Sequence, residues 1–490
     1  MIGKRATIAA ASIAVFGLPS LSRADVVVST APTANMTCTG GVCSPTARKA
    51  VLNVSDLATM LASGDVTIQS GALAQDIDFA APLKWTTIQR LTLDSYHSIY
   101  FQKPVVVAGT GSLTIVTDDG GSGGDFRFSG KGHVEFRVPY NGGDNSLIIN
   151  GHPYTLVGGM HELTRLTKGG FGQPYLALVK SIDLSGTSYS SSPLRALNST
   201  LEGLGNSISN LTTNNTQGAG SAGLIGTFGG GEEFTLRDLN LTSVNIVAAG
   251  VDQPIGALAS LSYGAIQNVY VSGSITATGT FAKIGGLAGT QLGPIINAQC
   301  DVAITAGSMA QAGGLAGTLD GATNQFAIVV QNSFSTGTIT ASDNSSVGGL
   351  VGVSTGNVIV NSYSTASVAG GANSWVGGAV GMQESTVFDF GLRNVYATGN
   401  ATAGSGSSVG GLIGSDSAGS SNADAYWDLD TSGVSDPSKG AGNIADDPGL
   451  TGLTTAEFQS ALPAGFEASV WRESATVNSG YPYLIGNPPK

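Results

Sequence analysis

Residues 347–352 read Val-Gly-Gly-Leu-Val-Gly, and residues 361–366 read Asn-Ser-Tyr-Ser-Thr-Ala. Related copies of the first block lie at Ile284–Gly289, Ala312–Gly317, Val376–Gly381 and Val409–Gly414. Related copies of the second block begin at Asn268, Asn297, Asn332 and Asn394. The last glycines of the first block are 28, 35, 29 and 33 residues apart, and the opening asparagines of the second are 29, 35, 29 and 33 apart. A shared period of about 30 residues is typical of stacked repeats, so we interpret each unit as one coil of a parallel β-helix.

The composition of the whole chain favours the same architecture. Of 490 residues 72 are glycine, and 11% are charged, against about 25% in a typical globular domain. Glycine inside a helix costs roughly 1 kcal/mol relative to alanine, whereas Gly, Ser, Thr and Val suit short strands and tight turns. We therefore predict an all-β fold, a right-handed parallel β-helix (solenoid) with short capping helices. The helices are expected at 55–61 with Ser55 as the cap, at 160–167, and at 454–461 with a Thr454–Glu457 capping box.

The two blocks resemble GLUG repeats, which occur in bacterial surface and secreted proteins similar to filamentous haemagglutinins. The likeness extends to flanking segments and covers about residues 145–487; these segments are Leu147–Leu156, Ile182–Gly186, Leu201–Leu211, Gly449–Phe458 and Gly480–Leu484. The resemblance implies a β-helical fold and a location at the cell surface or outside the cell. It implies no particular activity. The chain carries no Asn-Pro-Asn secretion motif near residue 60, so the secretion route stays open.

The first residues have the pattern of an export signal. Lys4 and Arg5 precede the uncharged apolar run Ala6–Leu18, and Ser22-Arg23-Ala24 offers a small-x-small cleavage site. An uncleaved anchor is the alternative, although 13 residues are too few to span a bilayer. The expected organisation is a signal peptide at 1–24, an N-terminal segment at 25–50, irregular coils at 51–220, GLUG-type repeat coils at 221–430 and a C-terminal cap at 431–490.

Three cysteines agree with export. Cys38 and Cys43 flank a short segment with two glycines, which permits a tight hairpin, and we expect a disulfide between them. A metal site is the alternative, but it would need two further ligands, and the four histidines have no ligand spacing. Cys300 falls at a predicted core position and needs no partner.

Alternation within the second block predicts which side chains face outward. Every second residue after the asparagine is small or apolar and is assigned to the core, which leaves one ring per coil outside. The resulting candidate ligand-contact stripe comprises Tyr270, Phe334, Tyr363 and Tyr396, with Gln299 interrupting it. The rings could stack for stability, could contact a glycan or protein, or could lie in the core if the assigned facing is inverted. The asparagine column is interpreted as a corner with a hydrogen-bond ladder.

The acidic residues do not recur at the repeat period, so we expect no catalytic, cofactor-binding or metal-binding residues. One irregular site near Asp118, Asp119, Arg127 and Glu135 stays open as an alternative. Gly120–Asp125 resembles one copy of a calcium-binding nonapeptide, but we interpret it as a turn because such sites need tandem copies.

The sequence thus predicts an exported, non-catalytic β-solenoid that acts as a surface adhesin or as a structural or interaction protein. A glycan or an extracellular protein is the expected partner. The net charge is −12 and the basic residues are scattered, which argues against nucleic acid, and no apolar run of spanning length follows Pro19. The alternative is a polysaccharide-active lyase or hydrolase, which requires acids with Arg or Lys in one groove of residues 66–240.

Overall fold

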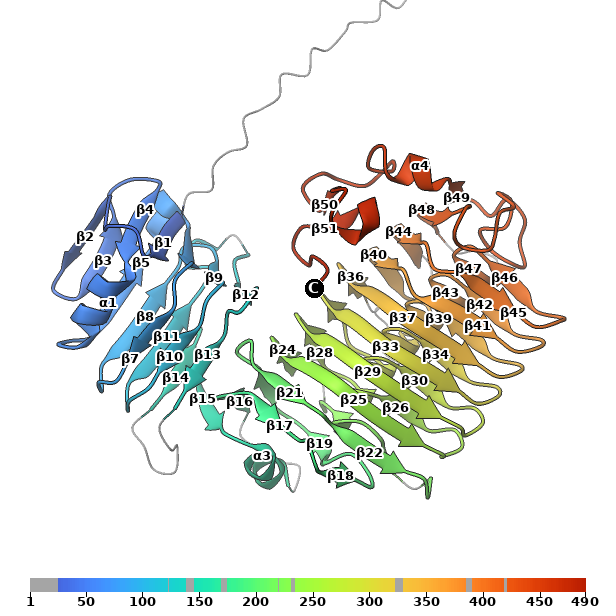
Figure 1. The fold of residues 1–490 in the computed structure, drawn as a ribbon, viewed down its shortest axis with the longest axis horizontal. Coiled ribbons are helices and arrows are strands. Elements are labelled where there is room, and N and C mark those ends of the chain that lie inside the picture. The colour runs from blue at the N-terminus through green and yellow to red at the C-terminus, as the bar shows by residue number, and fades with distance from the viewer. Residues whose placement is uncertain are drawn as a thin grey trace, which may run out of the picture.

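The computed structural model describes residues 25–121, 123–137, 145–168, 174–218, 220–230, 234–321, 329–384, 390–417 and 421–490. The predicted export signal, residues 1–24, lies outside this part of the chain. The described residues are nearly all β and form long parallel sheets arranged in an arc (Figure 1). The all-β prediction is confirmed.

The N-terminal part of the arc holds three sets of parallel strands. The first set is β4 (Ala50–Asn53), β1 (Asp25–Ser29), β6 (Asp76–Phe79), β9 (Ile99–Phe101) and β12 (Phe126–Phe128). The second is β7 (Leu83–Trp85), β10 (Val105–Val107) and β13 (Val134–Phe136). The third is β3 (Val42–Pro45), β5 (Val66–Gln69), β8 (Arg90–Asp94), β11 (Ser112–Val116) and β14 (Leu147–Ile149). Strand β2 (Met36–Thr39) pairs with β3 as an antiparallel hairpin.

The repeat half is built from equivalent strands that pair in parallel with the next unit. We call each unit a coil. The long strands are β25 (Asn240–Ala248), β29 (Tyr270–Ala277), β33 (Gln299–Ala306) and β37 (Phe334–Ala341), and later coils split this strand into β40 (Val358–Ser364) with β41 (Ser367–Gly370) and β44 (Gly391–Ala397) with β45 (Ala401–Ala403). Short strands precede them: β16 (Tyr175–Leu178), β20 (Thr200–Glu202), β24 (Thr235–Arg237), β28 (Ala265–Gln267), β32 (Ile295–Ile296) and β36 (Val329–Gln331).

The glycine-rich block forms the other two sheets of the repeat half. One contains β26 (Pro254–Gly256), β30 (Lys283–Gly285), β34 (Gln311–Gly313), β38 (Ser346–Gly348), β42 (Trp375–Gly377) and β46 (Ser408–Gly410). The other contains β19 (Leu194–Leu197), β23 (Ile225–Phe228), β27 (Ala259–Ser262), β31 (Ala288–Gln291), β35 (Ala316–Asp320), β39 (Val351–Thr355), β43 (Val380–Glu384) and β47 (Ile413–Asp416). The block needs glycine because adjacent coils touch there. A Cβ on Gly348 would overlap the carbonyl oxygen of Val351 and the amide of Gly381.

The helices lie largely where the sequence places them. Helix α1 (Val54–Leu61) begins after Asn53, whose side chain accepts from the amides of Ser55 and Asp56. The expectation that Ser55 is the cap is therefore wrong, because Asn53 stands two residues earlier in extended conformation. Helix α3 (Met160–Thr167) has the expected bounds. Helix α4 (Thr455–Phe458) is shorter than expected, but the capping box of Thr454 and Glu457 is confirmed.

The cysteines behave as expected. Cys38 and Cys43 form a disulfide between directly opposite residues of β2 and β3. Cys300 is a free thiol in the repeat core, and burial raises its pKa.

Candidate functional site

The predicted stripe of rings forms one column, but most of it is covered. Phe334, Tyr363 and Tyr396 are 3%, 0% and 0% exposed, and Tyr270 is half-buried. The expectation of an exposed stripe is therefore wrong for three of its four rings. The assigned facing is right, because the residues that alternate with the rings lie in the repeat core while the rings belong to a separate apolar cluster. The cover is the last part of the chain, residues 454–490, which folds back along the coils (Figure 1).

The rings stack on one another across the coils. The centroids of Phe334 and Tyr363 are 4.6 Å apart at 7°, and those of Tyr363 and Tyr396 are 4.9 Å apart at 2°. In-register pairing of β37, β40 and β44 places these rings side by side. The predicted stacking is confirmed for these three rings, and such cross-strand pairs generally stabilise sheets.

A second layer of aromatic side chains seals the stack. Phe458, Phe466, Trp471 and Tyr481 come from the covering segment, which includes strands β50 (Trp471–Arg472) and β51 (Tyr483–Leu484). The hydroxyl of Tyr396 donates to the carbonyl of Pro482 over 2.6 Å, and the side-chain amide of Asn478 donates to that hydroxyl over 2.7 Å. Burial raises the pKa of Tyr396. The stack therefore serves as the docking surface of the chain's own cap.

Beyond β51 the chain continues as a strap, which we define as residues 485–490. The side chain of Gln299 donates to Asn487 Oδ1 over 2.7 Å and to the carbonyl of Pro488 over 2.8 Å. In return, Asn487 Nδ2 donates to the backbone carbonyl of Asn332 over 2.8 Å. Gln299, the one residue that interrupts the ring column, thus binds the strap through two hydrogen bonds.

The strap ends against the first coils of the repeat half and touches the N-terminal part. Lys490 Nζ lies 4.3 Å from the ring centroid of Tyr270 and donates to Asn240 Oδ1. Arg127, the middle residue of β12, donates to the carbonyl of Gly486 over 3.4 Å. Figure 1 marks this end of the chain between β12 and the repeat half. The strap therefore joins the two parts of the arc.

The asparagine column is confirmed as a corner, and side-chain hydrogen bonds join two of its neighbouring pairs. Asn268, Asn297, Asn332, Asn361 and Asn394 all have φ between 47° and 53°. Asparagine is among the few residues that take this left-handed conformation readily. Asn297 donates to Asn268 over 3.0 Å, and Asn394 to Asn361 over 3.1 Å.

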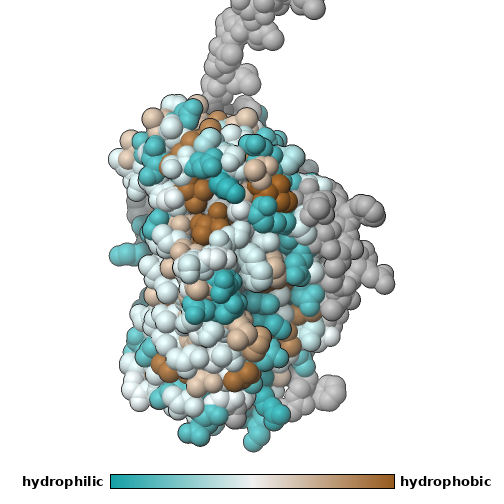
Figure 2. Space-filling model, turned by 90° about the vertical axis from the view of Figure 1, so that its right-hand side faces the viewer, coloured by the Kyte–Doolittle hydropathy of each residue, from teal (hydrophilic) through white to brown (hydrophobic). Residues whose placement is uncertain are grey.

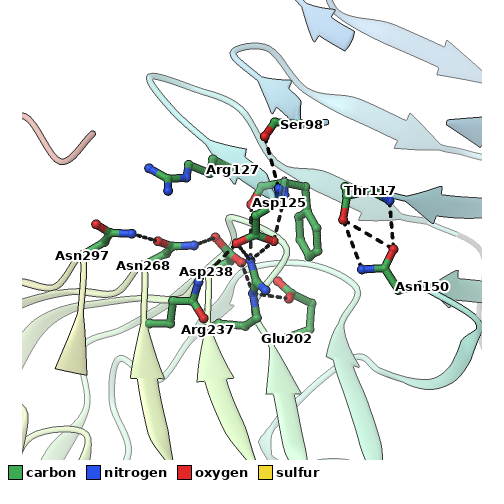
Figure 3. A network of polar contacts seen from close by, with 12 residues as sticks. Ser98, Thr117, Asp125, Arg127, Asn150, Glu202, Arg237, Asp238, Asn268 and Asn297 are labelled. Atoms are coloured by element: carbon green, nitrogen blue, oxygen red, sulfur yellow. Dashed lines mark hydrogen bonds and ion pairs between the residues drawn. The ribbon is translucent and has the colours of Figure 1, made fainter. Parts of the chain in front are cut away.

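A charged cluster that the sequence did not predict lies where the two parts of the arc meet (Figure 3). Its centre is Arg237, which ends β24. Arg237 Nη2 donates to both carboxylate oxygens of Asp125 at 2.9 Å, and Nε lies 2.6 Å from Asp238 Oδ2 and 3.4 Å from Glu202 Oε2. The guanidinium also lies 4.4 Å from the ring centroid of Phe126. We call these four charged residues the junction cluster.

The junction cluster is buried and has more acids than bases. Glu202 and Asp238 are 0% and 4% exposed. Burial and the charge of Asp238 raise the pKa of Glu202 well above its ordinary value, and burial raises the pKa of Asp238 to about 6. Burial opposes the charge of Arg237, but the carboxylates outweigh this effect and raise its pKa. All three acids are directed at one guanidinium.

These shifts predict a pH dependence of stability. The pKa of Asp238 lies above its unfolded value of 3.8, so its protonation stabilises the fold fully below that value and this contribution is lost as the pH rises through about 6. At about 1.4 kcal/mol per pKa unit, the contribution is at most roughly 3 kcal/mol. We expect Tm to rise between pH 7 and pH 5, and to rise less in Asp238→Asn, because asparagine occupies the equivalent corner of later coils. The difference between the two profiles reports the contribution of the Asp238 carboxyl together with its effect on Glu202, and equal profiles would contradict the prediction.

The residues proposed as an irregular acidic site have separate partners. Asp118 accepts from the amide of Gly123 over 2.7 Å, Glu135 pairs with Arg137 at 3.0 Å, and Arg127 holds the strap. Asp119 is exposed. Asp125, the last residue of the segment Gly120–Asp125 that we interpret as a turn, belongs to the junction cluster and accepts from Arg237.

The described residues contain neither a cluster of metal ligands nor a helix that could span a membrane. Within the described ranges, no three His, Cys, Asp or Glu side chains are grouped as metal ligands would be. None of the helices in that part of the chain has the length and apolar character needed to cross a bilayer.

Comparison with known proteins gives distant likenesses. No protein-family profile matches the chain. A stretch of 147 residues, 30% of the chain, is 30% identical to halomucin of Haloquadratum walsbyi, of which it spans 1%. A solved chain from Bacteroides ovatus, assigned as an immunoglobulin A1 protease, aligns with 68% of this chain and 92% of its own length at 17% identity, with a TM-score of 0.46. At this score the likeness assigns neither fold nor activity.

Proposed function

We propose that the chain is an exported, non-catalytic right-handed parallel β-helix that acts as a surface adhesin or structural interaction protein. A glycan or an extracellular protein is the proposed partner. Support comes from the coils that pair in parallel register and from the disulfide, which is typical of proteins outside the cytosol. The GLUG-like blocks agree with the same location.

The observation that carries this proposal is a face of hydroxyl side chains beside the covered rings. Thr276, Thr305 and Thr340 lie in register on β29, β33 and β37, and Thr305 and Thr340 are exposed. Adjacent coils are about 4.8 Å apart, so the hydroxyls form regular rows of donors and acceptors. Such rows offer donors and acceptors to which the hydroxyl groups of a sugar chain can bond. Figure 2 shows another side of the molecule, where residues of intermediate hydropathy predominate and the hydrophilic and the hydrophobic residues lie in separate groups.

A polysaccharide-active enzyme is the second candidate, and the junction cluster favours it. Asp125, Glu202, Arg237 and Asp238 bring acids together with an arginine within residues 66–240. The cluster ranks second because its acids converge on Arg237, and Glu202 and Asp238 are buried. Hydrolysis instead needs two carboxylates on either side of a bound sugar.

The test is a binding screen of residues 25–490 against glycans and matrix proteins, with product analysis on each polysaccharide. We expect binding without cleavage, and Thr305→Lys to weaken binding at least tenfold with unchanged Tm, because it places a charged side chain on the hydroxyl face. Ser405→Lys, at an exposed turn, is the matched control and should bind as the parent does. The adhesin proposal fails if the folded chain binds no partner or if Thr305→Lys binds equally well. Cleavage that Asp125→Asn abolishes would establish the enzyme.

A further inference from the structure

The residues that bind the strap belong to the repeat half and not to the cap, residues 454–484, from which the strap extends. The side chain of Asn487 bonds to Ala298, Gln299 and Asn332, more than 150 residues away in sequence. Lys490 reaches Asn240 and Tyr270 in still earlier coils. The strap therefore docks as a separate peptide would, on side chains and carbonyls of the repeat half.

The strap is suited to bind in extended form. It reads Ile-Gly-Asn-Pro-Pro-Lys, and its two prolines fix φ and lack an N–H that would need a partner. A segment already restricted in this way loses less conformational entropy on docking than a flexible one. Asn487 is the buried anchor, at 6% exposed.

The strap leaves part of its seat unsatisfied. Gln299 Oε1 and Asn332 Oδ1 are buried and have no hydrogen-bond partner among the described residues. Buried acceptors without a donor cost free energy, which weakens the hold of the strap. The cap has anchors of its own in Trp471, Tyr481 and Leu484, so release of the strap would leave these contacts in place.

From these contacts we infer that the strap seat, formed by Asn240, Tyr270, Gln299 and Asn332, is a docking site for the strap of a second copy of this chain. Exchange re-forms the same contacts between copies and so costs little. At low protein concentration each chain binds its own strap in preference to that of another copy, because the effective concentration of the tethered strap is in the millimolar range. At the high local concentration of a crowded surface, exchanged straps join copies to one another.

The first experiment measures docking of a free strap. The acceptor chain lacks residues 486–490, and its fold is checked by circular dichroism and Tm. The probe is a fluorescent peptide, Ile-Gly-Asn-Pro-Pro-Lys. We expect saturable binding of the peptide to the acceptor chain. Gln299→Ala in the acceptor should weaken this binding at least tenfold, because it removes two hydrogen bonds. A peptide with alanine in place of its asparagine should not bind saturably. If Gln299→Ala lowers Tm, Tyr270→Ala replaces it. No saturable binding to the folded acceptor overturns the inference.

The second experiment tests exchange with two complementary chains. The donor carries Gln299→Ala with its strap intact, so its own seat holds a strap at least tenfold more weakly, and the acceptor lacks residues 486–490 and so has no strap of its own. We expect a one-to-one complex by analytical ultracentrifugation when both are mixed at about 0.1 mM, below the effective concentration of a tether. A donor that also carries Asn487→Ala should form none. Peptide binding without a complex of the two chains would overturn exchange between copies.

Discussion

Arg237→Met is expected to lower the free energy of unfolding by about 3–5 kcal/mol, the usual cost of leaving buried charges without their partner. The variant keeps the volume of the side chain but leaves Asp125, Glu202 and Asp238 facing one another at the junction of the two parts of the arc. The loss should be largest at neutral pH and smaller in acid, where the buried carboxyl groups take up protons. Thermal unfolding at pH 7 and pH 5 measures both effects.

Arg195→Met is the matched control for this variant. Arg195 is an exposed residue of β19, and its replacement should change the free energy of unfolding by no more than about 0.5 kcal/mol. If Arg237→Met and Arg195→Met lowered the free energy of unfolding equally, the junction cluster would contribute no more to stability than an exposed arginine does.

Tyr396→Ala is expected to cost about 3–5 kcal/mol, the range for truncation of a large buried ring. Tyr396 packs against Tyr363, Phe458, Trp471 and Tyr481 and anchors Pro482 through its hydroxyl. Its loss should release the covering segment, so limited proteolysis should cut within 454–490 before it cuts the coils.

Tyr270→Ala provides the control in the same column. Tyr270 is half-buried and contacts Lys490 of the strap instead of the aromatic cap. We expect this variant to cost less than about 1 kcal/mol and to leave the protease pattern unchanged. If both variants behaved alike, the cap would not depend on the ring stack.

Local pattern predicted the β content, the facing of the repeat strands and the asparagine corner, because each follows from neighbouring residues. Alternation separates the rings from the core, and asparagine adopts φ near 50° more readily than most residues. The cover over Phe334 to Tyr396 was not predictable in this way. It depends on residues 454–490 returning to coils more than 80 positions earlier.

The junction cluster was missed for a similar reason. Asp125 and Arg237 are 112 residues apart, and no period links them. One signal was available: Arg237-Asp238 stands where the next coil has Gln267-Asn268, so a charged pair replaces a neutral one at this corner. A departure from the repeat at one coil marks the place where the coils meet another part of the chain.

The parallel pairing of coil on coil also determines how the molecule bears force. Backbone hydrogen bonds between coils run along the stack, so tension along it pulls directly on those bonds, one ladder after another. Coils should then peel away singly, and the rupture force should be set by the weakest ladder and not by the number of coils. The strap crosses from β12 to several repeat coils and so bears load beside the ladders of the junction. Stretching should break this short polar segment early, while the stacked rings still hold the cap in place.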